Sequence, residues 1–261
     1  MIRLGFLGAG NMAFAIAGAV SDKLDEYVIV PYDISEERIN LFKSNFKNVE
    51  PVNQASELEA CDILILAVKP QMMKAATAPL SNFSGLVISI AAGIGIFFYE
   101  EIMPNARVIR VMPNTPCLVG EMAAGFAPGS RATEKDLKAA ETILGAAGVA
   151  LKVEESLIDA VTGVSGSGPA YFARLAEAFI KAGIDAGLSP DVSRQLSLQT
   201  MKGTAALLLE KNMSPEELVT MVSSPNGTTV AGREVLEASD YEKIVSETVE
   251  ATIKRSKELG K

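Results

Sequence analysis

A short apolar strand, a glycine turn and a helix follow one another at the start of the chain. Residues 2–7 are mostly apolar, and Gly8-Ala9-Gly10 follows them directly. The first glycine permits a tight turn, the second lets backbone N–H groups approach an anionic ligand, and the small Ala13 lets helix and strand pack closely. The pattern predicts the first half of a βαβ unit. A glycine-rich turn without any ligand is the alternative.

An acidic residue after the second predicted strand extends this pattern. Asp33 follows the strand expected over residues 27–32 and stands 23 residues after Gly10. A carboxylate at this place usually accepts hydrogen bonds from the adenosine ribose 2′-hydroxyl, which favours NAD. Ser35 and Arg38 could instead bind a 2′-phosphate, and Asp33 could simply cap a helix. The two markers together predict a nicotinamide dinucleotide site.

Strand-like and helix-like segments alternate through the first half of the chain. The runs 63–68, 86–90 and 107–111 are almost continuously apolar, as expected for parallel strands buried on both faces. A helix over 134–147 and a short strand over 150–153 complete the unit. We therefore expect an α/β fold, with a Rossmann-like dinucleotide-binding domain over residues 1–157 and a mostly parallel sheet.

The remaining residues, 158–261, are expected to form an all-helical domain. Helices are predicted over 169–188, 191–211, 230–236 and 240–259, with another starting at Ser214. On the first of these, polar residues form one narrow stripe, so the helix should be covered on several sides. A subunit interface would cover it. Packing against the first domain alone is the alternative.

Composition excludes several classes of function. The net charge is −8 with no basic block, which argues against nucleic acid and against an anionic membrane surface. Histidine is absent, which removes the commonest acid–base group and zinc ligand, so no metal is expected. The longest apolar stretch, 86–98, is too short to span a bilayer, and we expect a cytoplasmic protein.

Five segments go beyond a generic dinucleotide fold. They are Gly5-Phe6-Leu7-Gly8-Ala9-Gly10-Asn11-Met12-Ala13, Ala67-Val68-Lys69-Pro70, Val111-Met112-Pro113-Asn114-Thr115-Pro116, Gly163-Val164-Ser165-Gly166-Ser167-Gly168-Pro169-Ala170-Tyr171 and Val222-Ser223-Ser224-Pro225-Asn226-Gly227-Thr228-Thr229. In this order and spacing the sequence resembles pyrroline-5-carboxylate reductase. The resemblance covers essentially the whole chain.

This resemblance implies a reaction and an assembly. The reaction is the reduction of 1-pyrroline-5-carboxylate to L-proline, the last step of proline biosynthesis, by NADPH or NADH. The helical domain, residues 158–261, would bind substrate and intertwine with that of a second copy. The resulting homodimer is often assembled further, in this family, into a decameric ring of dimers.

The resemblance also implies which residues form the site. The segment from Ser223 to Thr229 fits a substrate carboxylate, because successive N–H groups at a helix start bind anions. Family members usually have glycine where Asn226 stands, and asparagine tolerates the backbone angles that glycine adopts. Thr229 matches the position beside the imine nitrogen and is assigned as proton donor or relay. The implied substrate-binding residues are Ser224, Asn226, Gly227, Thr228 and Thr229. The implied cofactor-binding residues are Gly8, Gly10, Asn11, Met12, Asp33, Ser35, Arg38, Asn53, Ala67, Lys69, Pro70, Met112, Asn114 and Ser165.

Two other functions fit parts of the sequence. One is a reductase of related two-domain design that acts on another small imine or on a β-hydroxyacid. The β-hydroxyacid enzymes would rely on a catalytic lysine in the helical domain, but Lys181, Lys202 and Lys211 lie in no recognisable motif. A dinucleotide sensor without turnover would not need the substrate loop at 223–229. Both alternatives are therefore less favoured than a reductase of 1-pyrroline-5-carboxylate.

Overall fold

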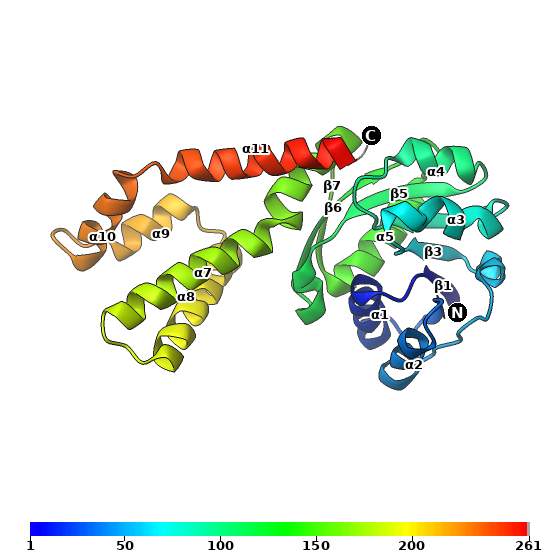
Figure 1. Cartoon of the computed structure of the whole chain (residues 1–261), viewed down its shortest axis with the longest axis horizontal. Helices are drawn as coiled ribbons and strands as arrows, with labels where there is room; N and C mark the ends of the chain where they lie inside the picture. Colours follow the sequence, from blue (N-terminus) through cyan, green and yellow to red (C-terminus); the bar gives the residue numbers. More distant parts are fainter. Residues whose placement is uncertain (260–261) are drawn as a thin grey trace. The chain divides into compact units, whose positions relative to one another are not determined.

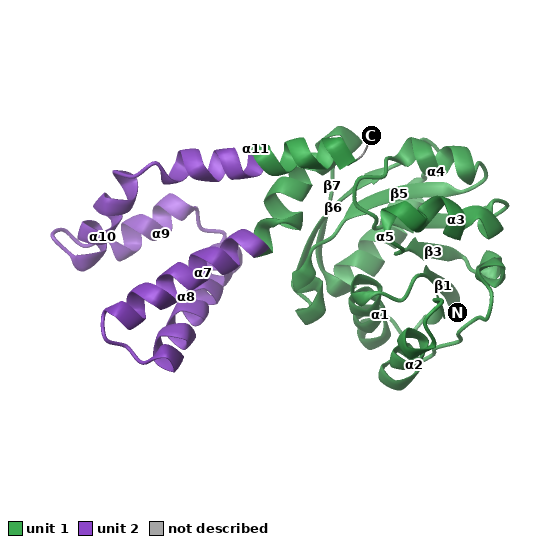
Figure 2. Ribbon diagram, in the orientation of Figure 1, with its two compact units in different colours: residues 1–169, 250–261 green, residues 170–249 purple. Residues whose placement is uncertain are grey.

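The computed structural model describes residues 1–259 and divides into two compact units (Figure 2). Unit 1 contains Met1–Pro169 together with the C-terminal segment from Glu250, and unit 2 contains Ala170–Val249. The helical domain is expected over residues 158–261. Its last two residues, 260 and 261, lie outside the part of the chain that the structure describes.

A seven-stranded sheet forms the centre of unit 1, in the order β2-β1-β3-β4-β5-β6-β7 (Figure 1). The first five strands are parallel, β6 runs antiparallel to β5, and β7 is parallel to β6. The strands are β1 (Ile2–Leu7), β2 (Tyr27–Tyr32), β3 (Ile63–Leu66), β4 (Leu86–Ser89), β5 (Arg107–Met112), β6 (Met122–Pro128) and β7 (Gly148–Lys152). The strand order reverses between β1 and β3, and ligands of such sheets bind at the carboxyl ends of the strands beside that reversal.

Helices cover both faces of this sheet, which confirms the expected α/β class. One buried cluster joins Ile16, Phe42 and Leu144 to one face, and a second joins Met73 and Tyr99 to the other. The helices involved are α1 (Asn11–Lys23), α2 (Glu36–Asn45) and α5 (Glu134–Ala147) on the first face, and α3 (Met73–Thr77) and α4 (Ile96–Ile102) on the second. Burial on both faces explains why the parallel strands read as continuous apolar runs.

Several strands differ from the sequence-based expectation. Strand β4 ends one residue earlier and β5 one residue later than expected, and β7 spans Gly148–Lys152 instead of residues 150–153. Strand β3 ends at Leu66, two residues earlier than predicted, and the chain at Ala67 and Val68 then passes close to Gly8. Strand β6 is not predicted by the sequence pattern, because it contains no β-branched residue. It is held between β5 and β7, and its Gly125 leaves room for Val161.

Beyond residue 157 the described part contains helices and no strand. A four-residue helix, α6 (Ile158–Val161), and a π-helical turn (Thr162–Gly166) precede α7. The longer helices are α7 (Gly168–Asp185), α8 (Pro190–Glu210), α9 (Pro215–Val222), α10 (Thr228–Glu237) and α11 (Tyr241–Leu259). The start of α9 is fixed by Ser214 and Glu217, whose side chains accept from each other's backbone N–H groups.

Unit 2 buries very little of its own apolar surface. Among residues 170–249, Ala176 and Ser193 alone have buried side chains. Phe172 and Phe179, on α7, are 60% and 66% exposed. Folded proteins seldom leave so many large apolar side chains open to water, so we expect the helices of unit 2 to pack against a further surface. No helix in the described residues is both long and apolar enough to cross a membrane.

Candidate active site

The two glycines of the turn after β1 have different physical roles. Gly8 has a φ of +97°, and a Cβ there would lie 3.0 Å from the carbonyl carbon of Ala67. Gly10 has an ordinary extended backbone, with φ −67° and ψ 178°, and a Cβ there would have no heavy atom within 4 Å. Gly8 is therefore required by the fold. Gly10 is not, and it keeps a space open above the turn.

The N-terminus of α1 borders that open space. The helix begins at Asn11, its N-cap Gly10 makes no side-chain cap, and its first turn contains no acidic residue. The first N–H groups of a helix lack partners within the helix, and together with the helix dipole they attract anions. Gly10, Asn11 and Met12 thus form a site that fits the pyrophosphate of a dinucleotide.

Side chains from the end of β2 hold the glycine turn in place. The Ala9 N–H donates to Asp33 Oδ2 over 2.7 Å, and Arg38 Nε donates to the Ala9 carbonyl over 2.7 Å. Asp33 Oδ1 accepts the N–H of Ser35 over 2.9 Å. Ser35 is the N-cap of α2, and its hydroxyl accepts from the Arg38 N–H. Asp33, Ser35 and Arg38 thus lie together beside the turn.

Two further predicted cofactor positions lie after β2 and β3. Lys69 is exposed and precedes the 3₁₀ turn that begins at Pro70, just beyond the carboxyl end of β3. Asn53 is also exposed, and its backbone N–H donates to Glu57 Oε1 over 3.1 Å. The structure therefore leaves the side chains of Asn53 and Lys69 available to a ligand.

Asn114 and Ser165 are 51 residues apart and are joined by hydrogen bonds. Asn114 Nδ2 donates to the carbonyl and the hydroxyl oxygen of Ser165, over 3.3 and 3.2 Å. Asn114 Oδ1 accepts the N–H of Ala123 over 3.0 Å, and the Ser165 hydroxyl donates to the Ala123 carbonyl. The Asn114 side chain is buried, so its contacts fix the π-helical turn beside the end of β5.

A glycine in the π-helical turn makes a second connection to β5. A Cβ at Gly166 would lie 2.5 Å from Cε of Met112. The glycine therefore allows the Met112 side chain to pack against the turn. Turns of this type often occur at functional sites, and this one places Ser165 and Met112 at the carboxyl edge of the sheet.

The sequence did not single out the segment that follows β4. Ile90, Ala91, Ala92 and Gly93 lie at the same carboxyl edge, and Gly93 has a φ of +76°. A cavity of about 350 Å³ is lined by Ala92, Gly93, Thr162, Ser167, Ala251, Thr252, Arg255, Ser256 and Leu259. The small residues after a buried strand were a usable sequence indication. The residues that α11 contributes to this cavity could not be predicted from the sequence, because their position depends on tertiary packing.

The loop before α10 belongs to unit 2 and has the backbone expected of an anion site. Asn226 has a φ of +58°, so asparagine does adopt a glycine-like conformation here. Gly227 is the N-cap of α10 and makes no side-chain cap, and the first turn contains no acidic residue. A Cβ at Gly227 would lie 2.6 Å from Ser224 Oγ. The buried Ser223 Oγ has no hydrogen-bond partner among the described residues.

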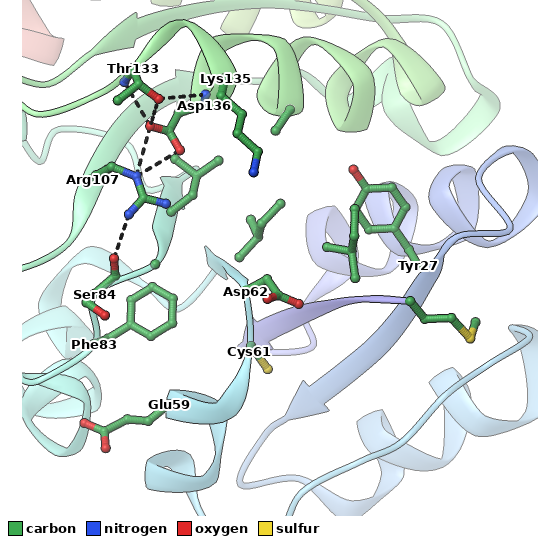
Figure 3. A pocket seen from close by; sticks show the side chains of 16 residues that line it. Tyr27, Glu59, Cys61, Asp62, Phe83, Ser84, Arg107, Thr133, Lys135 and Asp136 are labelled. Carbon is green, nitrogen blue, oxygen red and sulfur yellow. Dashed lines mark hydrogen bonds and ion pairs between the residues drawn. The ribbon is translucent and has the colours of Figure 1, made fainter.

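A larger cavity, of about 850 Å³, lies at the opposite edge of the sheet (Figure 3). Its lining includes the first residues of β1, β2, β3, β4 and β5, so it is far from the glycine turn. Arg107 donates to both oxygens of Asp136 over 3.0 Å and to the Ser84 carbonyl over 2.8 Å. Burial raises the pKa of the Asp136 carboxyl, but donation from Thr133 and Arg107 outweighs it and holds this pKa below its ordinary value. The network stabilises the sheet edge and has no place in the cofactor site.

Neither cysteine is suited to act as a nucleophile. Cys61 and Cys117 are both free and buried. Burial raises the pKa of each thiol to about 11. The reactive species is the thiolate, so both side chains are inert near neutral pH. Within the described residues, no three His, Cys, Asp or Glu side chains come together as metal ligands.

Two family models match the chain. The model described as pyrroline-5-carboxylate reductase dimerisation matches residues 155–259. The model described as NADP oxidoreductase, coenzyme F420-dependent, matches residues 3–93. The second range contains the glycine turn and Asp33, and the first contains the loop before α10.

Individual proteins match over the full length. A pyrroline-5-carboxylate reductase of Synechocystis is 40% identical over 265 residues, which cover 100% of this chain and 99% of that protein. One of Methanosarcina acetivorans is 39% identical, with 99% and 98% covered. The solved Coxiella burnetii pyrroline-5-carboxylate reductase is 31% identical and superposes with a TM-score of 0.94, with 99% of this chain and 98% of that chain covered. The Plasmodium falciparum pyrroline carboxylate reductase, solved with NADP bound, is 30% identical with a TM-score of 0.86, with 100% and 98% covered.

Proposed function

Since this chain belongs to the pyrroline-5-carboxylate reductase family, we propose that it reduces 1-pyrroline-5-carboxylate to L-proline with NADPH or NADH. This is the final step of proline biosynthesis. The open anion site between Gly10 and α1 is the observation that carries the proposal, because a Cβ at Gly10 would occupy empty space. Neither the backbone conformation nor the packing at residue 10 requires a glycine. A ligand that approaches the backbone closely explains why a glycine stands there.

The residues at the carboxyl edge of unit 1 would hold the cofactor. Gly8, Gly10, Asn11 and Met12 would bind the pyrophosphate through backbone N–H groups. Asp33, Ser35, Arg38 and Asn53 would lie at the adenosine end, and Ala67, Lys69, Pro70, Met112, Asn114 and Ser165 would line the remaining length. The nicotinamide supplies the hydride that the reduction requires. Asn114 would act through its hydrogen bonds, which hold Ser165 and the π-helical turn.

The loop before α10 would hold the substrate carboxylate. The N–H groups of Thr228 and Thr229 stand in the first turn of α10, where no side chain caps the helix. Hydrogen bonds to a charged group contribute roughly 1.5–3 kcal/mol each, so two or three could bind a carboxylate without arginine. Ser224, Asn226 and Gly227 would shape the loop around it.

Thr229 would act on the imine nitrogen. An imine carbon accepts a hydride readily once its nitrogen is protonated, and the reacting carbons must come within about 3–3.5 Å. A threonine hydroxyl can donate or relay that proton, although it is a weak acid, so water would be the ultimate source. The chain contains no histidine that could take this role instead.

The exposed apolar side chains of unit 2 support assembly through this part of the chain. We propose a homodimer in which the helices of residues 158–261 from two copies cover one another, with a decameric ring of dimers as the larger assembly. Phe172 and Phe179 would be buried in the dimer. The enzyme would act in the cytoplasm, without nucleic acid or a membrane as partner.

A spectrophotometric assay tests the proposed reaction. The purified protein is mixed with 1-pyrroline-5-carboxylate and either NADH or NADPH, and the absorbance of the reduced nicotinamide is followed. We expect oxidation that depends on both the imine and the protein, with L-proline formed in equal amount. Absence of oxidation with both cofactors would refute the proposed function.

A further inference from the structure

The carboxylate of Asp33 is held in one orientation at the end of β2. One oxygen accepts the Ala9 N–H over 2.7 Å and the other accepts the Ser35 N–H over 2.9 Å. An ionised carboxylate has about four lone-pair sites, so each oxygen can still accept from a ribose hydroxyl. The turn that binds the pyrophosphate therefore has a fixed negative charge beside it.

The surrounding charges do not balance this carboxylate. Glu36 and Glu37 occupy the first turn of α2, directly after the N-cap, and both are exposed. Arg38 is the one cation in this stretch, and its Nε already donates to the Ala9 carbonyl over 2.7 Å. A 2′-phosphate carries a charge of about −1.5 to −2 at neutral pH. The stretch from Asp33 to Arg38, beside which it would bind, contains three carboxylates and one partly committed guanidinium.

We propose that Asp33 determines the cofactor preference of this chain and that the preference is for NADH over NADPH. The inference rests on the proposed function, because it assigns a choice between the two cofactors of that reaction. An acidic residue at the end of the second strand accepts from the ribose 2′-hydroxyl and repels a phosphate at the same position. The Plasmodium falciparum relative was solved with NADP bound, so the fold itself admits a 2′-phosphate. The residues at the end of β2 therefore decide the preference.

Direct binding measurements separate this inference from catalysis. The dissociation constants of NADH and NADPH are measured by the change in nicotinamide fluorescence, and kcat/KM is measured with each cofactor. We expect the unmodified protein to bind NADH at least about tenfold more tightly than NADPH. The Asp33→Asn variant should reduce this ratio by about tenfold, since one unit charge near the phosphate is removed. Asp25→Asn, an exposed aspartate before β2, makes the same change in net charge and should leave the ratio unaltered.

A second variant avoids disturbing the glycine turn. Ile34 follows Asp33, is 91% exposed, and can be replaced by arginine without removing a hydrogen bond of Asp33. Ile34→Arg should tighten NADPH binding by about tenfold and leave NADH binding nearly constant. Equal or tighter binding of NADPH by the unmodified protein would overturn the inference. So would equal losses for both cofactors in Asp33→Asn, together with no gain for NADPH in Ile34→Arg. Discrimination in binding without turnover would support the inference and refute the proposed function.

Discussion

Gly8 and Gly10 are two residues apart, yet alanine should have opposite effects on stability at the two positions. The backbone at Gly8 has a φ of +97°, and a Cβ there would lie 3.0 Å from both the Ala67 carbonyl carbon and Val68 Cγ1. A left-handed conformation costs an L-residue about 1–2 kcal/mol, and forcing a methyl group into a packed region adds about 1 kcal/mol or more. We therefore expect Gly8→Ala to lower the free energy of unfolding by roughly 2–3 kcal/mol.

Gly10 has a backbone that any residue can adopt, with φ −67° and ψ 178°. Replacement of glycine by alanine at such a position stabilises a protein by about 0.4–1 kcal/mol, because the unfolded chain loses conformational freedom. The added methyl group would instead fill the space above the first turn of α1. The dissociation constant of the cofactor should then rise by at least about tenfold, or about 1.4 kcal/mol.

Thermal unfolding with and without NADH tests both expectations. For a chain of this size, 1 kcal/mol corresponds to about 2–4 °C in Tm, so Gly8→Ala should lose roughly 4–12 °C. Gly10→Ala should keep or raise the Tm of the free protein. It should also lose most of the rise in Tm that bound cofactor produces. A Gly10→Ala variant with a lowered Tm and an undiminished cofactor-induced rise would refute the assignment of Gly10 to the ligand.

Three further predictions concern the substrate loop, the sheet edge and the thiols. Thr229→Ala should lower kcat by about 10²–10⁴-fold and leave the free energy of unfolding unchanged. Replacement of the exposed Thr142 by alanine is the control and should leave kcat unaltered. Near-normal turnover by Thr229→Ala would exclude the proposed role of Thr229. Asp136→Asn should cost about 1–3 kcal/mol near pH 7. Because the pKa of Asp136 is depressed in the folded state, its contribution is present above its unfolded pKa of about 4 and lost as the pH falls below that. Urea unfolding at pH 7 and pH 3 checks this, and equal losses at both would contradict it. Cys61 and Cys117, with thiol pKa values of about 11, should react with a disulfide reagent at pH 8 only after unfolding, so rapid labelling of the native protein would be evidence against their burial.

Local features of the sequence were enough to predict most of unit 1. The helix at Glu134–Ala147 has the predicted limits, because Thr133 and Asp136 form a capping box at its start. The parallel strands were visible as apolar runs between polar residues. Strand β6 was not visible, since Met122–Pro128 consists largely of small residues and is defined by its neighbours in the sheet.

The candidate site was predictable where a residue acts through its own backbone. The turn at Gly8 and Gly10 and the positive φ of Asn226 both follow from what those residues can adopt. The contact between Asn114 and Ser165 could not be predicted in this way, because it joins residues that are 51 positions apart in the sequence. Asp33 illustrates the same limit, because its position after the second strand is predictable, whereas the hydrogen bonds that fix its orientation are not.

Transfer of an isotopic label from the cofactor to the product tests the central claim most directly. The protein is incubated with 1-pyrroline-5-carboxylate and a reduced nicotinamide cofactor that carries deuterium at C4 of the nicotinamide ring, and the product is analysed by mass spectrometry. If the chain catalyses hydride transfer to the imine carbon, one stereospecific form of the labelled cofactor yields L-proline with a single deuterium at C5. Formation of unlabelled proline with both stereospecific forms, or of no proline, would contradict the account.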